Sequence, residues 1–226
     1  MKLSSQPVAV SVFVGALLLT TRARADPTPP QTHDGVQFRG AIGPAYLSDS
    51  ESADDGSFSG TLSGVAATVD LYLGGTPVPG FRIGGFISGT TVFSPSVSVG
   101  GQSGTSGTSL TLTQVGPYVD WYPSSTNGFH ALAGIGFAYL TSNNGQTDAN
   151  GNPASTNNGI GFGLDLGAGY DWWVSDKVNV GVLARFSYAR TSFSQSSTDP
   201  ISGDTSTLSV SDSMITPAIL FSVAYH

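Results

Sequence analysis

The side chains best suited to proton transfer in this sequence are three histidines, His33, His130 and His226. Nucleophilic catalysis needs a hydroxyl or thiol that is activated by such a histidine, which an acid in turn orients. The sequence has no cysteine, so a thiolate is excluded both as a nucleophile and as a metal ligand. His130 is followed by Ala131 and Leu132, so it lacks a His-x-Ser spacing. We therefore predict no catalytic residue and interpret His130 as a polar side chain of the interior.

Two acidic segments could offer oxygen ligands to a hard cation such as Ca²⁺. The segment 49–56 contains four carboxylates without the regular alternate spacing of a calcium loop. The segment 148–152 comes closer, but Pro153 stands where a sharp turn needs glycine, and no glutamate closes the loop. We interpret both segments as solvated loops and predict neither a metal site nor a cofactor.

The first 25 residues have the features of a secretory signal peptide. Lys2 supplies a positive start, Val8 to Thr20 is apolar, and Ala23-Arg24-Ala25 offers a small-x-small cleavage site. The apolar run is shorter than the roughly 20 residues of a membrane-spanning helix, which disfavours the alternative of an uncleaved anchor. The predicted organisation is a signal peptide at 1–25, a short Pro-rich periplasmic tail at 26–34 and one domain at 35–226.

The charge balance argues against nucleic acid as a partner. Removal of the signal peptide takes away Lys2, Arg22 and Arg24, so the formal net charge falls by three, from −7 to −10. Binding to nucleic acid needs a basic face, which so acidic a chain does not offer.

Eight segments of alternating apolar and polar residues fill the predicted domain. In the sixth, Phe162 and Leu164 alternate with Gly163 and Asp165. One apolar face and one small or polar face are typical of a strand between lipid and a crowded lumen, although a soluble β-sandwich also alternates. The segments are 35–47, 58–73, 81–93, 108–122, 129–141, 159–174, 178–192 and 208–225.

The segment 108–122 does not alternate regularly. Leu110 and Leu112 share one parity, while Val115 and Val119 share the other. One extra residue would place all of them on one face, so we expect a β-bulge near 114–117.

Link lengths and aromatic residues favour a membrane barrel. Four long links (48–57, 94–107, 142–158 and 193–207) alternate with three short ones (74–80, 123–128 and 175–177). Outer-membrane barrels have this asymmetry, with short periplasmic turns and longer external loops. An aromatic belt at the membrane interface is predicted beside the short links, made of Phe81, Trp121, Tyr122, Phe129, Trp172 and Trp173. The fold prediction is an all-β, eight-stranded antiparallel up-and-down transmembrane β-barrel, with a soluble sandwich or lipocalin-like barrel as the alternative.

Charged residues of the strands fall on the face opposite the lipid. In an eight-stranded barrel the lumen is just wide enough for side chains to fill it, and buried charges of opposite sign should pair. The predicted lumenal charge network consists of Arg39, Arg82, Arg185, Asp70, Asp120, Asp165 and Asp171. We interpret it as a plug that specifies the barrel. A gated proton or ion path through rearranged pairs is the alternative.

With its signal peptide, eight segments, alternating links and final strand 219–225, the chain resembles the small eight-stranded outer-membrane barrels of the OmpA, OmpX and Opa-like group. The resemblance implies outer-membrane lipids and the barrel-assembly machinery as partners, the latter reading a terminal aromatic residue. Here His226 follows Tyr225, which departs from that pattern. Because some members of the group modify lipids, the resemblance also keeps an enzyme as an alternative.

We expect the exposed loops to carry the function of the protein, because binding sites are often formed by loops on a rigid scaffold. We predict a non-enzymatic outer-membrane barrel that stabilises the envelope or binds an external protein or surface ligand through its long loops. A narrow gated transport barrel and a lipid-modifying enzyme are the alternatives.

Overall fold

The structure is a computed structural model that describes residues 32–53, 56, 59–100, 102–107, 109–124, 126–143, 157–198 and 205–226. The predicted signal peptide, most of the predicted tail and the acidic segment 148–152 lie outside these residues. Within the described part, no helix is long and apolar enough to cross a membrane. The regular elements in these ranges are ten β-strands.

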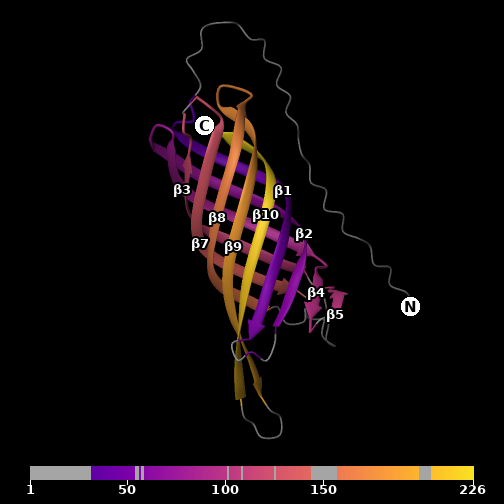
Figure 1. Cartoon of the computed structure of the whole chain (residues 1–226). Helices are drawn as coiled ribbons and strands as arrows, with labels where there is room; N and C mark the ends of the chain where they lie inside the picture. Colours follow the sequence, from indigo (N-terminus) through magenta and orange to yellow (C-terminus); the bar gives the residue numbers. More distant parts are fainter. Residues whose placement is uncertain are drawn as a thin grey trace, which may run out of the picture.

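Eight of the strands form one closed antiparallel barrel (Figure 1). Neighbours in sequence pair with one another around the wall, and the ladder between the first and last strands closes it. The predicted eight-stranded antiparallel up-and-down barrel is therefore confirmed. Its strands are β1 (Val36–Ala53), β2 (Ser59–Val78), β3 (Phe81–Phe93), β6 (Ser109–Trp121), β7 (Phe129–Asn143), β8 (Asn157–Trp173), β9 (Val178–Thr198) and β10 (Thr205–Tyr225).

The two ends of the barrel differ. The end that carries the short links 79–80, 122–128 and 174–177, together with residues 32–35 and 226, is called the turn end. The opposite end, called the loop end, carries the long links and the outer parts of the longest strands. β9 and β10 each have 21 residues, about twice the 9–11 residues that a tilted strand needs to cross a membrane. The strands therefore continue beyond the membrane at the loop end, further than the sequence pattern predicted.

A hairpin that the sequence pattern did not predict lies within the second long link. It consists of β4 (Ser96–Val99) and β5 (Gln102–Thr105). β4 pairs with the outer part of β2, at residues 60–63, where β3 has already ended. The chain changes direction at Ser94, whose φ is 51°. The hairpin therefore extends the wall at the loop end on one side (Figure 1).

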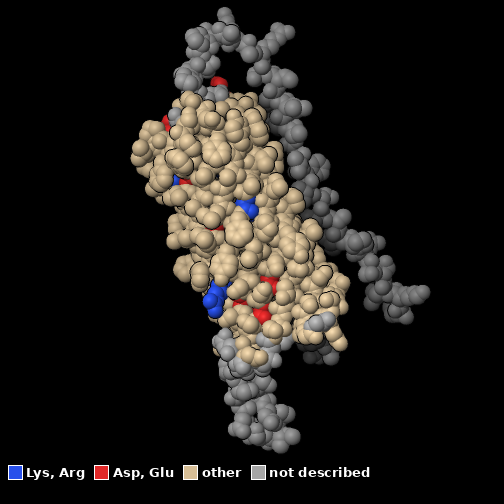
Figure 2. All heavy atoms as spheres, in the orientation of Figure 1, with Lys and Arg blue, Asp and Glu red and all other residues tan. Residues whose placement is uncertain are grey.

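The outer face of the barrel is apolar. Figure 2 shows that few charged side chains reach the surface over most of the wall. On β1 the exposed large apolar side chains end at Tyr46, and among the described side chains of β10 they begin at Ile215. Residues beyond these two positions, among them Asp49 and Asp212, lie outside the apolar band toward the loop end.

The expected β-bulge near 114–117 is wrong. β6 pairs with β3 without any shift of register from Ser109 to Trp121. Leu110 and Leu112 point into the barrel and are 3% and 2% exposed, whereas Val115 points outward. The apparent change of parity has a packing cause, because the lumen at that depth is lined with apolar side chains.

The seam between β1 and β10 is irregular. Its pairing is interrupted on both sides of the pair Ala45–Ala218, close to Pro44 and Pro217. Proline has no backbone N–H and cannot donate to the ladder. The small side chains here leave a groove of about 680 Å³ on the outer wall.

Candidate functional site

The interior of the barrel is the candidate site, because every second residue of the eight strands points into it. Glycines of β8 leave room there for long side chains from other strands. A Cβ added to Gly163 would lie 1.8 Å from Gln114 Oε1, and one added to Gly169 would lie 2.5 Å from His130 Nε2. The glycines on this face therefore set which side chains can cross the lumen.

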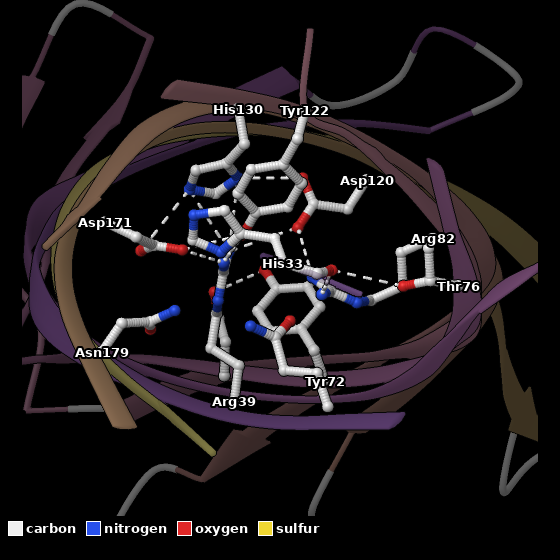
Figure 3. A network of polar contacts seen from close by, with 12 residues as sticks. His33, Arg39, Tyr72, Thr76, Arg82, Asp120, Tyr122, His130, Asp171 and Asn179 are labelled. Carbon is white, nitrogen blue, oxygen red and sulfur yellow. Dashed lines mark hydrogen bonds and ion pairs between the residues drawn. The ribbon is translucent and has the colours of Figure 1, made fainter. Parts of the chain in front are cut away.

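A buried polar cluster occupies the interior near the turn end (Figure 3). Arg39 is its centre: its Nη2 donates to Asp171 Oδ2 at 2.6 Å and also to the Tyr122 hydroxyl. Its Nη1 lies 3.5 Å from Asp120 Oδ2, which Arg82 Nη1 approaches at the same distance. We call it the turn-end cluster; its members are Arg39, Arg82, Asp120, Tyr122, His130 and Asp171.

His130 belongs to this cluster through its ring nitrogens. Nδ1 lies 2.8 Å from Asp120 Oδ1, and Nε2 lies 3.8 Å from Asp171 Oδ1. The ring stacks on Tyr122 with centroids 5.0 Å apart and is fully buried. Its contacts are thus with two acids, an aromatic ring and Arg39, whose Nη1 lies 3.4 Å from both ring nitrogens. This arrangement resembles a structural histidine rather than the base of a serine nucleophile.

A second polar cluster lies deeper, near the middle of the strands. Arg185 Nη1 donates to Asp70 Oδ1, and its Nε lies 3.8 Å from Asp165 Oδ1. Its Nη2 donates to the hydroxyls of Thr68 at 3.1 Å and Thr90 at 3.2 Å. We call these residues the middle cluster. All of them are at most 3% exposed.

Apolar side chains fill the depths between and beyond the clusters. Tyr72 and Phe86, 3% and 4% exposed, lie between the two clusters. Past the middle cluster, toward the loop end, Leu47, Val92 and Met214 are all 0% exposed. The described interior therefore consists of alternating polar and apolar layers.

The seven residues predicted as one lumenal charge network all lie inside the barrel, but at two depths. Arg39, Arg82, Asp120 and Asp171 belong to the turn-end cluster, whereas Arg185, Asp70 and Asp165 belong to the middle cluster. Sequence reasoning missed the neutral partners Tyr122, Thr68 and Thr90. The prediction selected only charged residues. These three neutral residues could have been found because their positions in the strand alternation also point inward.

Two members of the predicted aromatic belt, Tyr122 and Trp173, point to the inside of the barrel and not toward the membrane interface. Trp121 and Trp172 point outward and are 53% and 51% exposed, and Phe81 and Phe129 are also exposed. Tyr122 is 2% exposed inside the barrel, and Trp173 contacts the rings of His33 and His226. Each follows an outward-facing tryptophan directly, so strand alternation turns it to the inside.

The prediction that the acidic segment 49–56 is a solvated loop is wrong for the first part of this segment. β1 continues to Ala53, and Asp49 is 2% exposed inside the barrel. Asp54 and Asp55 lie outside the described residues. Serines alternate here with acidic residues, so the stretch has no apolar face from which a strand could be predicted.

The chain before β1 closes the turn end. The carbonyl of His33 accepts hydrogen bonds from Arg82 Nη2 at 2.7 Å and from the Thr76 hydroxyl at 3.3 Å. The His33 ring stacks on Tyr122 with centroids 4.2 Å apart, and the His226 ring packs edge-on against it at 5.6 Å. We call His33 and His226 the histidine cap. A residue of the predicted tail thus takes part in the barrel.

We expect the histidine cap to loosen on acidification. Burial, reinforced by nearby positive charges, lowers the pKa of His33 and of His226 to about 4, from an ordinary value near 6.5. Both rings lie beyond the membrane-spanning strands. Histidines released from the cap into solvent have the ordinary, higher pKa and therefore bind protons more readily than histidines in the cap. The contribution of the cap to stability is thus fully present above pH 6.5 and is lost as pH falls toward 4. Fluorescence of Trp173, taken as the difference from a Trp173→Phe variant, should change over this range.

The matched control replaces both histidines by phenylalanine, which keeps aromatic contacts but has no proton to gain. Its fluorescence should be flat between pH 7 and 4. An equal acid response in this variant would contradict the assignment of the transition to the cap.

Comparison with known proteins points to one family and one fold. The Autotransporter beta-domain family matches residues 43–213. The outer membrane protein OprG from Pseudomonas aeruginosa has 14% identity and a TM-score of 0.52, over 88% of this chain and 100% of OprG. Neisserial surface protein A (NspA) has 10% identity and a TM-score of 0.42, over 85% and 99%. The attachment invasion locus protein Ail of Yersinia pestis has 13% identity and a TM-score of 0.35, over 83% and 99%. No curated protein sequence matches the chain.

Proposed function

The chain belongs to the autotransporter β-domain family, and we propose that it works in the outer membrane as a closed, non-enzymatic scaffold that presents its loop end to molecules outside the cell. The coarser part of this statement, an outer-membrane β-barrel, follows from the family and the fold. The finer part rests on the interior and on the loop end.

The observation that carries the proposal is the filled interior. A barrel that conducts solutes needs a continuous polar path, whereas here fully buried Leu47, Val92 and Met214 lie between the middle cluster and the loop end. Arg39 and Arg185 are each held by two or more partners. Displacing either guanidinium group costs free energy, because an acidic partner would remain buried without its opposite charge. We infer that the two clusters and the histidine cap act together as a plug.

The loop end supplies the surface for interaction. We propose that it faces outward and the turn end faces the periplasm, as in other outer-membrane barrels. The β4–β5 hairpin and the outer halves of β9 and β10 rise beyond the apolar band there. All four residues of β5 are exposed, and polar strands on a rigid wall are well suited to recognition.

The remaining partners follow from the wall and from assembly. The apolar band contacts outer-membrane lipids, and the final strand enters the membrane through the barrel-assembly machinery, with export depending on the predicted signal peptide. An enzymatic role has no support from His130, the deeply buried histidine of the turn-end cluster.

The test of the plug is electrical. Purified full-length protein in planar lipid bilayers should give no sustained conductance at neutral pH. A variant with Leu47 and Met214 both replaced by serine should conduct more often, because it hydrates the apolar layer. A sustained open state in the unaltered protein would overturn the closed scaffold and favour the narrow gated channel.

The test of the scaffold uses whole cells that display the protein. Adherence to immobilised mucin, glycosaminoglycan and matrix protein should exceed that of cells without it. Replacement of the β4–β5 hairpin by a glycine-serine linker of equal length should reduce adherence, while the barrel keeps its heat-modifiable mobility on gels. Adherence equal to that of cells lacking the protein would overturn the scaffold.

A further inference from the structure

A small cavity near the loop end lies beyond both polar clusters. Its volume is about 120 Å³, and it is enclosed by residues from the inner faces of the strands. One side is acidic, with Asp49 and Glu51 from β1 and Asp212 from β10. Leu62 and Phe193 flank the acids on the neighbouring strands β2 and β9, and Leu110 and Leu140 line the opposite, apolar side.

The three carboxylates lie on one face of two paired strands. Glu51 is directly opposite Asp212 in the ladder, and Asp49 is two residues from Glu51. Like charges directly opposite each other destabilise a strand pair. None of the ion pairs among the described residues includes these acids. Arg190 on β9 is exposed on the outer face and does not enter the cavity.

One carboxylate oxygen lacks a partner although it is buried. Asp49 is 2% exposed and lines the cavity, and its Oδ1 has no hydrogen-bond partner among the residues that the structure describes. Buried carboxylates in proteins are almost always hydrogen-bonded or bound to a cation. The orphaned oxygen and the unopposed acids together indicate that a positively charged donor belongs in the cavity.

The walls decide which kind of cation fits. Hard metal ions take six or more oxygen ligands, or keep several waters, whereas half of this cavity is hydrocarbon. In the described part of the chain, no group of three or more His, Cys, Asp or Glu side chains is placed to hold a metal ion. A primary ammonium group needs only three acceptors and carries an apolar chain.

We propose that this cavity is a binding site for a small aliphatic primary amine, with its ammonium group on Asp49 and Asp212 and its alkyl chain against the leucines. Thr191, whose hydroxyl donates to Asp212 Oδ2 at 3.3 Å, holds the second acid in place. The inference is independent of the scaffold proposal, because a closed barrel and a conducting one could both hold a small cation at this mouth.

The proton balance of the site follows from its acids. Burial, with Asp212 and Glu51 nearby, raises the pKa of Asp49 to about 8, and burial with Glu51 raises that of Asp212 to about 6. Near neutral pH, Asp49 therefore holds a proton that an arriving ammonium displaces. Binding releases a proton, and affinity increases as pH rises from 6 to 8.

Calorimetry with n-butylammonium chloride tests the site, using the purified full-length protein in detergent micelles at pH 7.5. Saturable binding is expected, with proton release seen as a difference between buffers of unlike ionisation enthalpy. Asp49→Asn should weaken binding by about tenfold or more, the usual cost of losing a charged hydrogen bond. Asp176→Asn, at the turn end, should leave the affinity within about twofold.

Three outcomes would overturn the proposal: neutral n-butanol binding as well as n-butylammonium, Ca²⁺ binding more tightly than n-butylammonium, or an unchanged affinity in Asp49→Asn. Heat-modifiable gel mobility establishes that each variant is folded. Should Asp49→Asn not fold, Asp212→Asn replaces it, with the same tenfold loss expected and an unchanged affinity again contradicting the site.

Discussion

Replacement of Arg185 by methionine is expected to lower the free energy of unfolding of the barrel by about 3–5 kcal/mol, the usual cost of breaking a buried ion pair from one side. The change leaves Asp70 and Asp165 buried without their guanidinium. Methionine keeps much of the length and volume, so lost charge rather than a cavity is measured. Urea unfolding of the protein in lipid vesicles, followed by tryptophan fluorescence, gives the value.

The chain offers a matched control on the same strand. Arg190 is exposed on the outer face of β9, and Arg190→Met should change stability by only about 0.5 kcal/mol. The double variant Arg185→Met, Asp70→Asn should recover part of the loss, because one orphaned charge is removed with its partner. Equal losses in Arg185→Met and Arg190→Met would mean that the middle cluster does not specify the barrel.

Alanine at Gly116 is expected to have the second large effect, because the backbone of β7 leaves no room for a Cβ there. A Cβ at this position would lie 2.0 Å from the carbonyl oxygen of Ile135 and 2.5 Å from the Cα of Gly136. Both are backbone atoms, so the strands themselves must separate. We expect a loss of about 3 kcal/mol or more, at the upper end of overpacking costs, and less folded protein by heat-modifiable mobility.

Gly104→Ala is the control, since nothing lies within 4 Å of a Cβ at that position on β5. Its effect should stay within about 0.5 kcal/mol. A melting temperature of Gly116→Ala equal to that of Gly104→Ala would contradict the close approach of β6 and β7.

The sequence was informative wherever alternation alone decides the structure. The alternation correctly assigned Phe162 to the lipid-facing side and Asp165 to the lumen. The bounds of the third predicted segment, 81–93, match those of β3. Where a second cause competes with alternation, the pattern misled. Leu110 and Leu112 are apolar because they fill the lumen, and no rule about lipid-facing residues could assign them.

Features that depend on distant contacts were beyond the sequence. The β4–β5 hairpin exists because residues 96–99 find a free edge on β2, which only the folded wall provides. His33 is buried because Tyr122, Trp173 and Arg82 meet at the turn end from three separate parts of the chain. The cavity near Asp49 forms only because the strands continue past the apolar band. These extensions are rich in serine and threonine, so a search for alternating apolar residues does not detect them.

The interrupted ladder beside Pro44 and Pro217 has a consequence for assembly. β1 and β10 are the first and last strands of the barrel in the sequence, so the ladder between them closes the longest loop of chain and has the largest entropic cost of closure. The ladder that closes the barrel has its missing pairs in the middle of the wall, on both sides of the pair Ala45–Ala218. Local opening costs least where backbone hydrogen bonds are missing, so we expect this seam to open more readily beside the two prolines than along its uninterrupted stretches at either end.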